Sequence, residues 1–159
     1  MKTKTTITEI THEDLVNLLC TATEGSSWLE TGTTVKVRER IGIDPDECSE
    51  DLQARALIAG HTIVATDYYA EGEKYGGKCL VTFDDDRNAR YHLTLERIKE
   101  GIAAAIDGTF KTNGDPEIDF AATSARQFID DCRDYSSEFD LAAADCLMQI
   151  IMFNEIIYG

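Results

Sequence analysis

The chain has 159 residues and a formal net charge of −15, from 30 acidic and 15 basic side chains. This length is typical of one domain, residues 1–159, with enough chain to bury a hydrophobic core. A surface this acidic repels phosphate backbones, which argues against direct binding of nucleic acid and favours positively charged partners.

Cysteine usage and the chain ends predict a cytoplasmic protein. There are 5 cysteines, an odd number, and no pair has C-x-x-C spacing. Cys20, Cys132 and Cys146 fall within helical apolar patterns, where free cysteine behaves as a small hydrophobic residue. No apolar run follows the first lysines, so we expect no signal peptide. The closing apolar segment is too short and too interrupted by polar residues for a membrane span.

The first third of the chain predicts a helix, a strand and a second helix. Thr11 and Asp14 have the spacing of a capping box, and Gly25 is a suitable helix end. Residues 33–40 alternate between apolar and basic side chains, which is typical of a half-buried strand. A helix is then expected over residues 50–59.

The middle of the chain predicts a small antiparallel sheet. Residues 62–66 and 78–83 read as two strands that pair with each other across a polar loop, and residues 91–93 as a further short strand. The three carboxylates of residues 84–86 raise the possibility of a divalent cation, but they lack the spacing of a calcium loop. A solvated turn is the simpler interpretation.

Three helices are expected to close the chain. Thr94 caps the first, in which Gly101 would mark a close helix crossing, and Asp119 begins the second. Asp140 caps the last, which is expected to span about 17 residues and is apolar nearly all round. Such a helix is normally buried on several sides. We therefore predict an α+β fold, with a mainly antiparallel sheet of about three to four strands, about five helices and a central, buried C-terminal helix.

One candidate ligand pocket follows from the polar and aromatic residues near this last helix. Asp145 and Gln149 are four residues apart and so share a helix face. They would either face a cleft or bond loop backbone; Trp28 would either wall a pocket or plug the core. Lys36 and Arg38 would either hold an anion or pair with nearby carboxylates. The candidate pocket comprises Glu24, Trp28, Lys36, Arg38, Asp145 and Gln149.

No motif predicts catalysis. The histidines His12, His61 and His92 lack zinc-ligand spacing, and the chain has no P-loop, Rossmann glycine pattern or nucleophile elbow. We therefore predict no catalytic residues, no metal and no cofactor, and lean against an enzyme.

A row of carboxylates gives a second candidate site. Asp130, Asp134 and Glu138 recur at four-residue steps, with Asp131 beside them, and on a continuous helix they would lie about 6 Å apart. This is near twice the roughly 3.4 Å per-strand charge spacing of duplex DNA. The row would either compete for a basic nucleic-acid channel or form a solvated helix face.

The order of these segments resembles a loose family of small acidic proteins from phages, prophages and mobile elements of gut bacteria. Members pair an early A-x-E-G-G…Y-W segment with a closing D-x-x-x-Q-x-x-x-F-G-E-x-x-Y-G. The matching closing residues are Asp145, Gln149, Phe153, Glu155, Tyr158 and Gly159, and the chain departs from the pattern at Ser26, Ser27 and Asn154. The resemblance implies a bacterial host cell.

Charge and resemblance together predict an accessory protein that binds a basic host protein, plausibly blocking a nucleic-acid-binding defence machine by mimicry. Two alternatives stay open at this point. One is a small-ligand or nucleotide-binding protein, or an enzyme, that uses the candidate pocket. The other is a structural phage component, which self-assembly would reveal. The sequence predicts no membrane partner and leaves the oligomeric state open.

Overall fold

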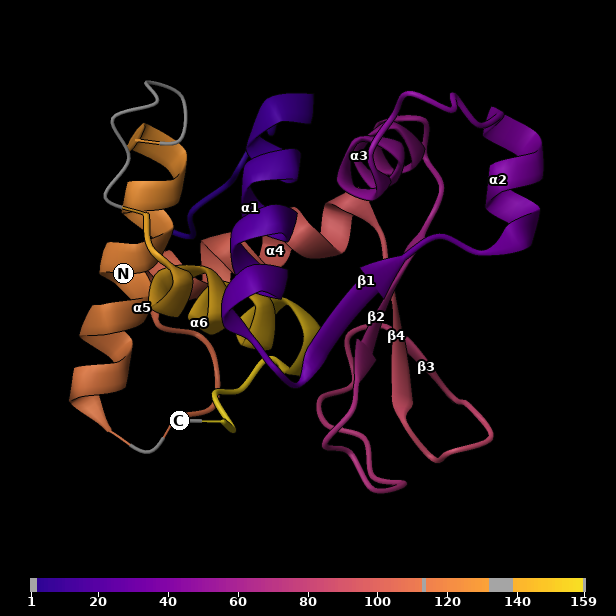
Figure 1. Ribbon diagram of the computed structural model, residues 1–159. Coiled ribbons are helices and arrows are strands. Elements are labelled where there is room, and N and C mark those ends of the chain that lie inside the picture. Colours follow the sequence, from indigo (N-terminus) through magenta and orange to yellow (C-terminus); the bar gives the residue numbers. More distant parts are fainter. Residues whose placement is uncertain (1–2, 113, 132–138, 159) are drawn as a thin grey trace.

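Six helices and a four-stranded sheet make up the part of the chain that the computed structural model describes, residues 3–112, 114–131 and 139–158 (Figure 1). The helices are α1 (His12–Gly25), α2 (Val35–Ile41), α3 (Ser49–Ile58), α4 (Leu95–Asp107), α5 (Asp115–Asp131) and α6 (Leu141–Phe153). The strands are β1 (Leu29–Gly32), β2 (Ile63–Asp67), β3 (Leu80–Phe83) and β4 (Ala89–Leu93). The predicted α+β class is confirmed.

The sheet has the order β1-β2-β4-β3, and all neighbouring strands are antiparallel. The predicted pairing of residues 62–66 with 78–83 is therefore wrong, because β4 lies between β2 and β3. Burial explains the order. Ala89, Tyr91 and Leu93 of β4 are all 0% exposed, whereas Leu80 and Phe83 of β3 are 66% and 44% exposed. The strand with a fully buried face takes the inner position, and the mostly exposed strand takes the edge.

The predicted strand at residues 33–40 is wrong, since these residues form the short helix α2. Thr34 caps the helix, its hydroxyl accepting from the Val37 amide at 3.2 Å. Val37 is buried while Val35 is 61% exposed, so the two valines do not share a face. Over so few residues, the alternating pattern did not separate a strand from two helical turns. The sheet strand that precedes α2, β1, was not predicted.

Helix α6 occupies the centre of the helical half, as predicted. It packs against α1, α4 and α5, and Figure 1 shows it in yellow between α1 and α5. The Asp140 carboxylate caps it by accepting from the Ala143 amide at 2.8 Å. The helix ends earlier than expected, at Phe153, because Asn154 takes a left-handed conformation with φ 53°. The residues after Asn154 therefore form an irregular tail.

Of two further helix predictions, the close crossing at Gly101 is confirmed and the start of α5 at Asp119 is wrong. Gly101 does mark a close crossing of α4 and α6, since a Cβ built there would lie 2.5 Å from Cγ1 of Ile151 and 2.8 Å from its Cα. Helix α5 begins at Asp115 rather than Asp119, and Pro116 fits its first turn because no helical amide bond is lost there. Among the described residues, every helix is too short or too polar to cross a bilayer.

Candidate functional site

Asp145 is the hub of a hydrogen-bond network at the face of α6 that meets the end of α1. Its Oδ2 accepts from Nε1 of Trp28 at 2.9 Å and from the hydroxyl of Ser26 at 2.5 Å. Its Oδ1 accepts from Nε2 of Gln149 at 2.5 Å. The structure thus brings together Trp28, Asp145 and Gln149 of the candidate pocket. Ser26, the fourth member, carries no sequence signal that would have singled it out.

Gln149 fixes the tail that follows α6. Its Oε1 accepts from the amides of Ile157 at 2.7 Å and Tyr158 at 2.8 Å, and its Nε2 also donates to the Tyr158 carbonyl at 2.9 Å. The side chain is 1% exposed. These bonds within the chain use both amide hydrogens and both oxygen lone pairs of Gln149, which leaves it no capacity for a ligand.

Aromatic rings fill the space beside this network. The Trp28 ring, 3% exposed, lies 5.5 Å from that of Phe153 and 5.2 Å from that of Tyr158, measured between centroids. The Tyr158 hydroxyl donates to Oδ2 of Asp67 at 2.8 Å, and burial raises the pKa of this carboxyl. Trp28 is therefore a core plug whose indole N–H is satisfied by Asp145.

The remaining candidate pocket residues lie on other elements. Glu24 is exposed near the end of α1, and Lys36 and Arg38 belong to α2, which Figure 1 shows at the sheet side of the molecule. Arg38 lines a cavity of about 530 Å³ beside β1. A separate cavity of about 560 Å³ is lined by Asp145 and Gln149. Asp145 and Gln149 thus line one cavity and Arg38 another.

The predicted carboxylate row lies mostly outside the described residues. Asp130 is exposed close to the end of α5, and Asp131 is the last residue of that helix. Asp134 and Glu138 lie outside the described residues. The row stays a prediction.

Three further carboxylates, on α1 and α3, act on one thiol of α1. The pKa of the Cys20 thiol is raised to about 11, first by burial and then by the negative charges of Glu50, Cys48, Glu24 and Asp51. We call Glu24, Glu50 and Asp51 the α1–α3 acidic face. Helix α1 packs on α3, so carboxylates of both helices act on Cys20, and they are too far apart in sequence for their spacing to predict this.

Cys48 and His12 both contact Asp51, but they do not form a catalytic triad. The Cys48 thiol donates to Oδ2 of Asp51 at 3.0 Å, while Nε2 of His12 lies 2.8 Å from Oδ1. This hydrogen bond raises the pKa of Cys48, so the thiolate is disfavoured. The carboxylate stands between thiol and imidazole, whereas nucleophilic catalysis needs the imidazole to contact the thiol.

The carboxylates after β3 hold a turn. Oδ1 of Asp84 accepts from the amides of Asp86 at 3.0 Å and Asn88 at 2.9 Å, which is the hydrogen bonding of an Asx turn. These bonds lower the pKa of Asp84. Within the described ranges, no group of three or more histidine, cysteine or acidic side chains is arranged to hold a metal ion.

Comparison of the chain with protein-family models, with curated proteins and with solved structures finds no match.

Proposed function

We propose that this protein binds a basic host protein through its carboxylates and so blocks a surface that would otherwise hold nucleic acid. The observation that carries the proposal is the α1–α3 acidic face. Glu24 of α1 and Glu50 and Asp51 of α3 all raise the pKa of one thiol, Cys20, and the two helices pack together. The local potential is therefore negative over more than one element.

The side chains of this face are available to a partner. Glu24 is exposed and Glu50 is partly exposed, and among the described residues neither has an ion-pair partner. Asp51 pairs with His12 at 2.8 Å. A basic partner would gain Coulomb attraction at Glu24 and Glu50 without breaking an internal ion pair.

The whole chain supports the same kind of partner. A net charge of −15 steers positively charged molecules toward the protein and speeds their association at low ionic strength. The resemblance of the closing segment to proteins of phages and mobile elements favours a bacterial host protein as the target. Nucleic-acid-binding enzymes present the basic channels that such a surface fits.

Affinity capture from bacterial lysate tests the proposal. Wild-type protein is compared with an E24Q/E50Q variant, which removes two charges from the face and keeps side-chain size. The matched control is D85N/D86N, which removes two exposed charges from the turn after β3. We expect a basic nucleic-acid-binding protein that is retained by wild type and control, released by heparin, and depleted several-fold by E24Q/E50Q.

Two results would contradict the proposal. One is the absence of any salt-sensitive basic protein in the wild-type capture. The other is a partner that both variants retain equally, because its binding would then not involve this face.

A further inference from the structure

A cavity over α4 has the opposite charge balance to the chain as a whole. Its volume is about 920 Å³, within the range of roughly 300–1,000 Å³ that small-molecule sites occupy. Its charged lining has five cations, although acidic residues outnumber basic ones two to one in the sequence. The cations are Lys4, Lys78, Arg97, Lys99 and Arg126, and the carboxylates are Glu96, Glu100 and Asp107.

All three carboxylates of this α4 cavity already have partners. Glu96 lies 3.7 Å from Nζ of Lys99, and Glu100 lies 3.3 Å from Nη1 of Arg97. Oδ2 of Asp107 accepts from the backbone amide of Thr5 at 2.8 Å. The five cations outnumber the three carboxylates, so the lining keeps a formal charge of +2.

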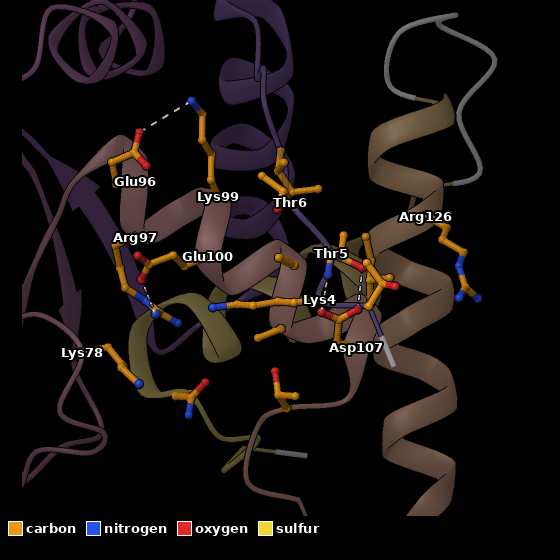
Figure 2. A pocket seen from close by; sticks show the side chains of 17 residues that line it. Lys4, Thr5, Thr6, Lys78, Glu96, Arg97, Lys99, Glu100, Asp107 and Arg126 are labelled. Carbon is orange, nitrogen blue, oxygen red and sulfur yellow. Dashed lines mark hydrogen bonds and ion pairs between the residues drawn. The ribbon is translucent and has the colours of Figure 1, made fainter. Parts of the chain in front are cut away.

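Three of the cations line one side of the cavity. Figure 2 shows the charged ends of Lys4 and Arg97 lying toward each other, with the Lys78 ammonium below them, while Lys99 and Arg126 point away. Neither the Lys4 nor the Lys78 ammonium has a hydrogen-bond or ion-pair partner within the described part of the chain. Lys4, Lys78 and Arg97 are like charges that line one cavity, and an anion bound there would be attracted to all three.

Arg97 lies at the inner side of this cluster, and its guanidinium group has hydrogen-bond donors that no described residue uses. The residue is 5% exposed, and its Nε and Nη2 donate to the carbonyls of Ile151 at 2.8 Å and Ile150 at 3.2 Å at the end of α6. With the bond to Glu100, three of the five guanidinium hydrogens are used. One hydrogen remains on each terminal nitrogen, and guanidinium hydrogens of this kind bind phosphate oxygens.

The two lysines are carried by segments that the fold holds in place. The Thr5 amide bound to Asp107 fixes the chain next to Lys4. Gly76 lies against the end of α6, where a Cβ would come within 2.4 Å of the Phe153 carbonyl oxygen, and this contact fixes the loop that carries Lys78. The cluster is therefore built by three segments that are distant in sequence.

We infer that the α4 cavity binds a phosphate-bearing small molecule, with Lys4, Lys78 and Arg97 on the phosphate. Ammonium and guanidinium groups together are the usual partners of phosphate oxygens. Beside them, Ile7, Ala103 and Ile106 give the cavity an apolar wall for the organic part of the ligand. This site is distinct from the α1–α3 acidic face, and either proposal stands if the other fails.

Calorimetric titration in phosphate-free buffer tests the inference. The probes are pyrophosphate and ADP, with adenosine as the uncharged comparison. The K4Q/K78Q variant removes the two exposed charges and leaves buried Arg97 in place. The matched control is K36Q/R40Q, which removes two exposed cations from α2, outside the cavity. Thermal melting of each variant verifies folding.

We expect pyrophosphate and ADP to bind wild type and control alike, adenosine to bind at least tenfold more weakly, and K4Q/K78Q to weaken both phosphate ligands about tenfold or more. Pyrophosphate binding as tight as ADP binding assigns recognition to the phosphate alone and supports the site. The inference is overturned if wild type binds neither phosphate ligand at millimolar concentration, if adenosine binds equally well, or if the control loses as much affinity as K4Q/K78Q.

Discussion

Asp145 joins α6 to the connection between α1 and β1 through one carboxylate, and its loss is expected to lower stability. Its two oxygens receive donors from Ser26, Trp28 and Gln149. Each donor would lose its partner if the carboxylate were removed, and an unsatisfied buried donor costs more than a hydrogen bond contributes.

Replacement of Asp145 by Asn is expected to lower the free energy of unfolding by about 1–3 kcal/mol, because the new NH2 group faces a donor instead of accepting from it. Urea denaturation followed by Trp28 fluorescence measures the loss. The matched control is D140N in the same helix, since Asn caps a helix as well as Asp does. Equal stability of D145N and wild type would show that the network contributes nothing.

Asp67 gives a pH dependence whose sign follows from its burial. The residue is 0% exposed, and burial raises its pKa, although bonds from Tyr158 and the Tyr69 amide lower it in part. The folded state therefore keeps this proton at pH values where the unfolded chain, with an Asp pKa of about 3.9, has released it. The contribution of Asp67 to the free energy of unfolding is greatest at low pH. It falls as the pH rises from about 3.9, the pKa in the unfolded chain, through the higher pKa of the folded state.

The D67N variant is expected to remove this dependence. The unfolding free energy of D67N minus that of wild type should increase as pH rises from about 4 to 7. Urea titrations at several pH values measure it. A Y158F variant should increase the pH dependence, because it removes a hydrogen bond that lowers the Asp67 pKa. A difference between D67N and wild type that is constant with pH would contradict the assignment.

At the scale of elements, the crossing of α4 on α6 depends on the missing side chain at residue 101. A Cβ there would meet both the side chain and the backbone of Ile151, at 2.5 Å and 2.8 Å, so the helices would have to separate. Overpacking of this kind costs typically about 1–3 kcal/mol. Alanine also favours the helix by about 1 kcal/mol over glycine, which offsets part of that cost.

The G101A variant is therefore expected to be less stable than wild type in urea denaturation, despite the gain in helix propensity. G32A is the control, because nothing lies within 4 Å of a Cβ built at Gly32. It should change the unfolding free energy by no more than about 0.5 kcal/mol. A G101A protein more stable than wild type would mean that the crossing adjusts freely.

Elements with a local signal in the sequence could be predicted. Features that depend on contacts between distant segments could not. Capping residues Thr11, Thr94 and Asp140 located three helix starts correctly. The place of β4 inside the sheet depends on burial of Tyr91 against the core, which no local pattern encodes. In the candidate site, helical spacing predicted that Asp145 and Gln149 share a helix face. The contact of Ser26 with Asp145, and those of the tail with Gln149 and Asp67, join segments that are distant in sequence.

At the scale of the whole molecule, charge is distributed unevenly. The chain carries −15 overall, and Glu24, Glu50 and Asp51 form the α1–α3 acidic face. The cations Lys4, Lys78 and Arg97 line a cavity over α4. The two surfaces call for ligands of opposite charge. A basic protein would be attracted to the acidic face, whereas the cations of the cavity would attract an anion.

The binding isotherm of the captured basic partner, measured across a range of salt concentrations, tests the proposed function most directly. The account predicts that E24Q/E50Q weakens binding several-fold at low salt and reduces its salt dependence, while D85N/D86N matches wild type. Affinities that are the same for all three proteins, or insensitive to salt, would contradict it.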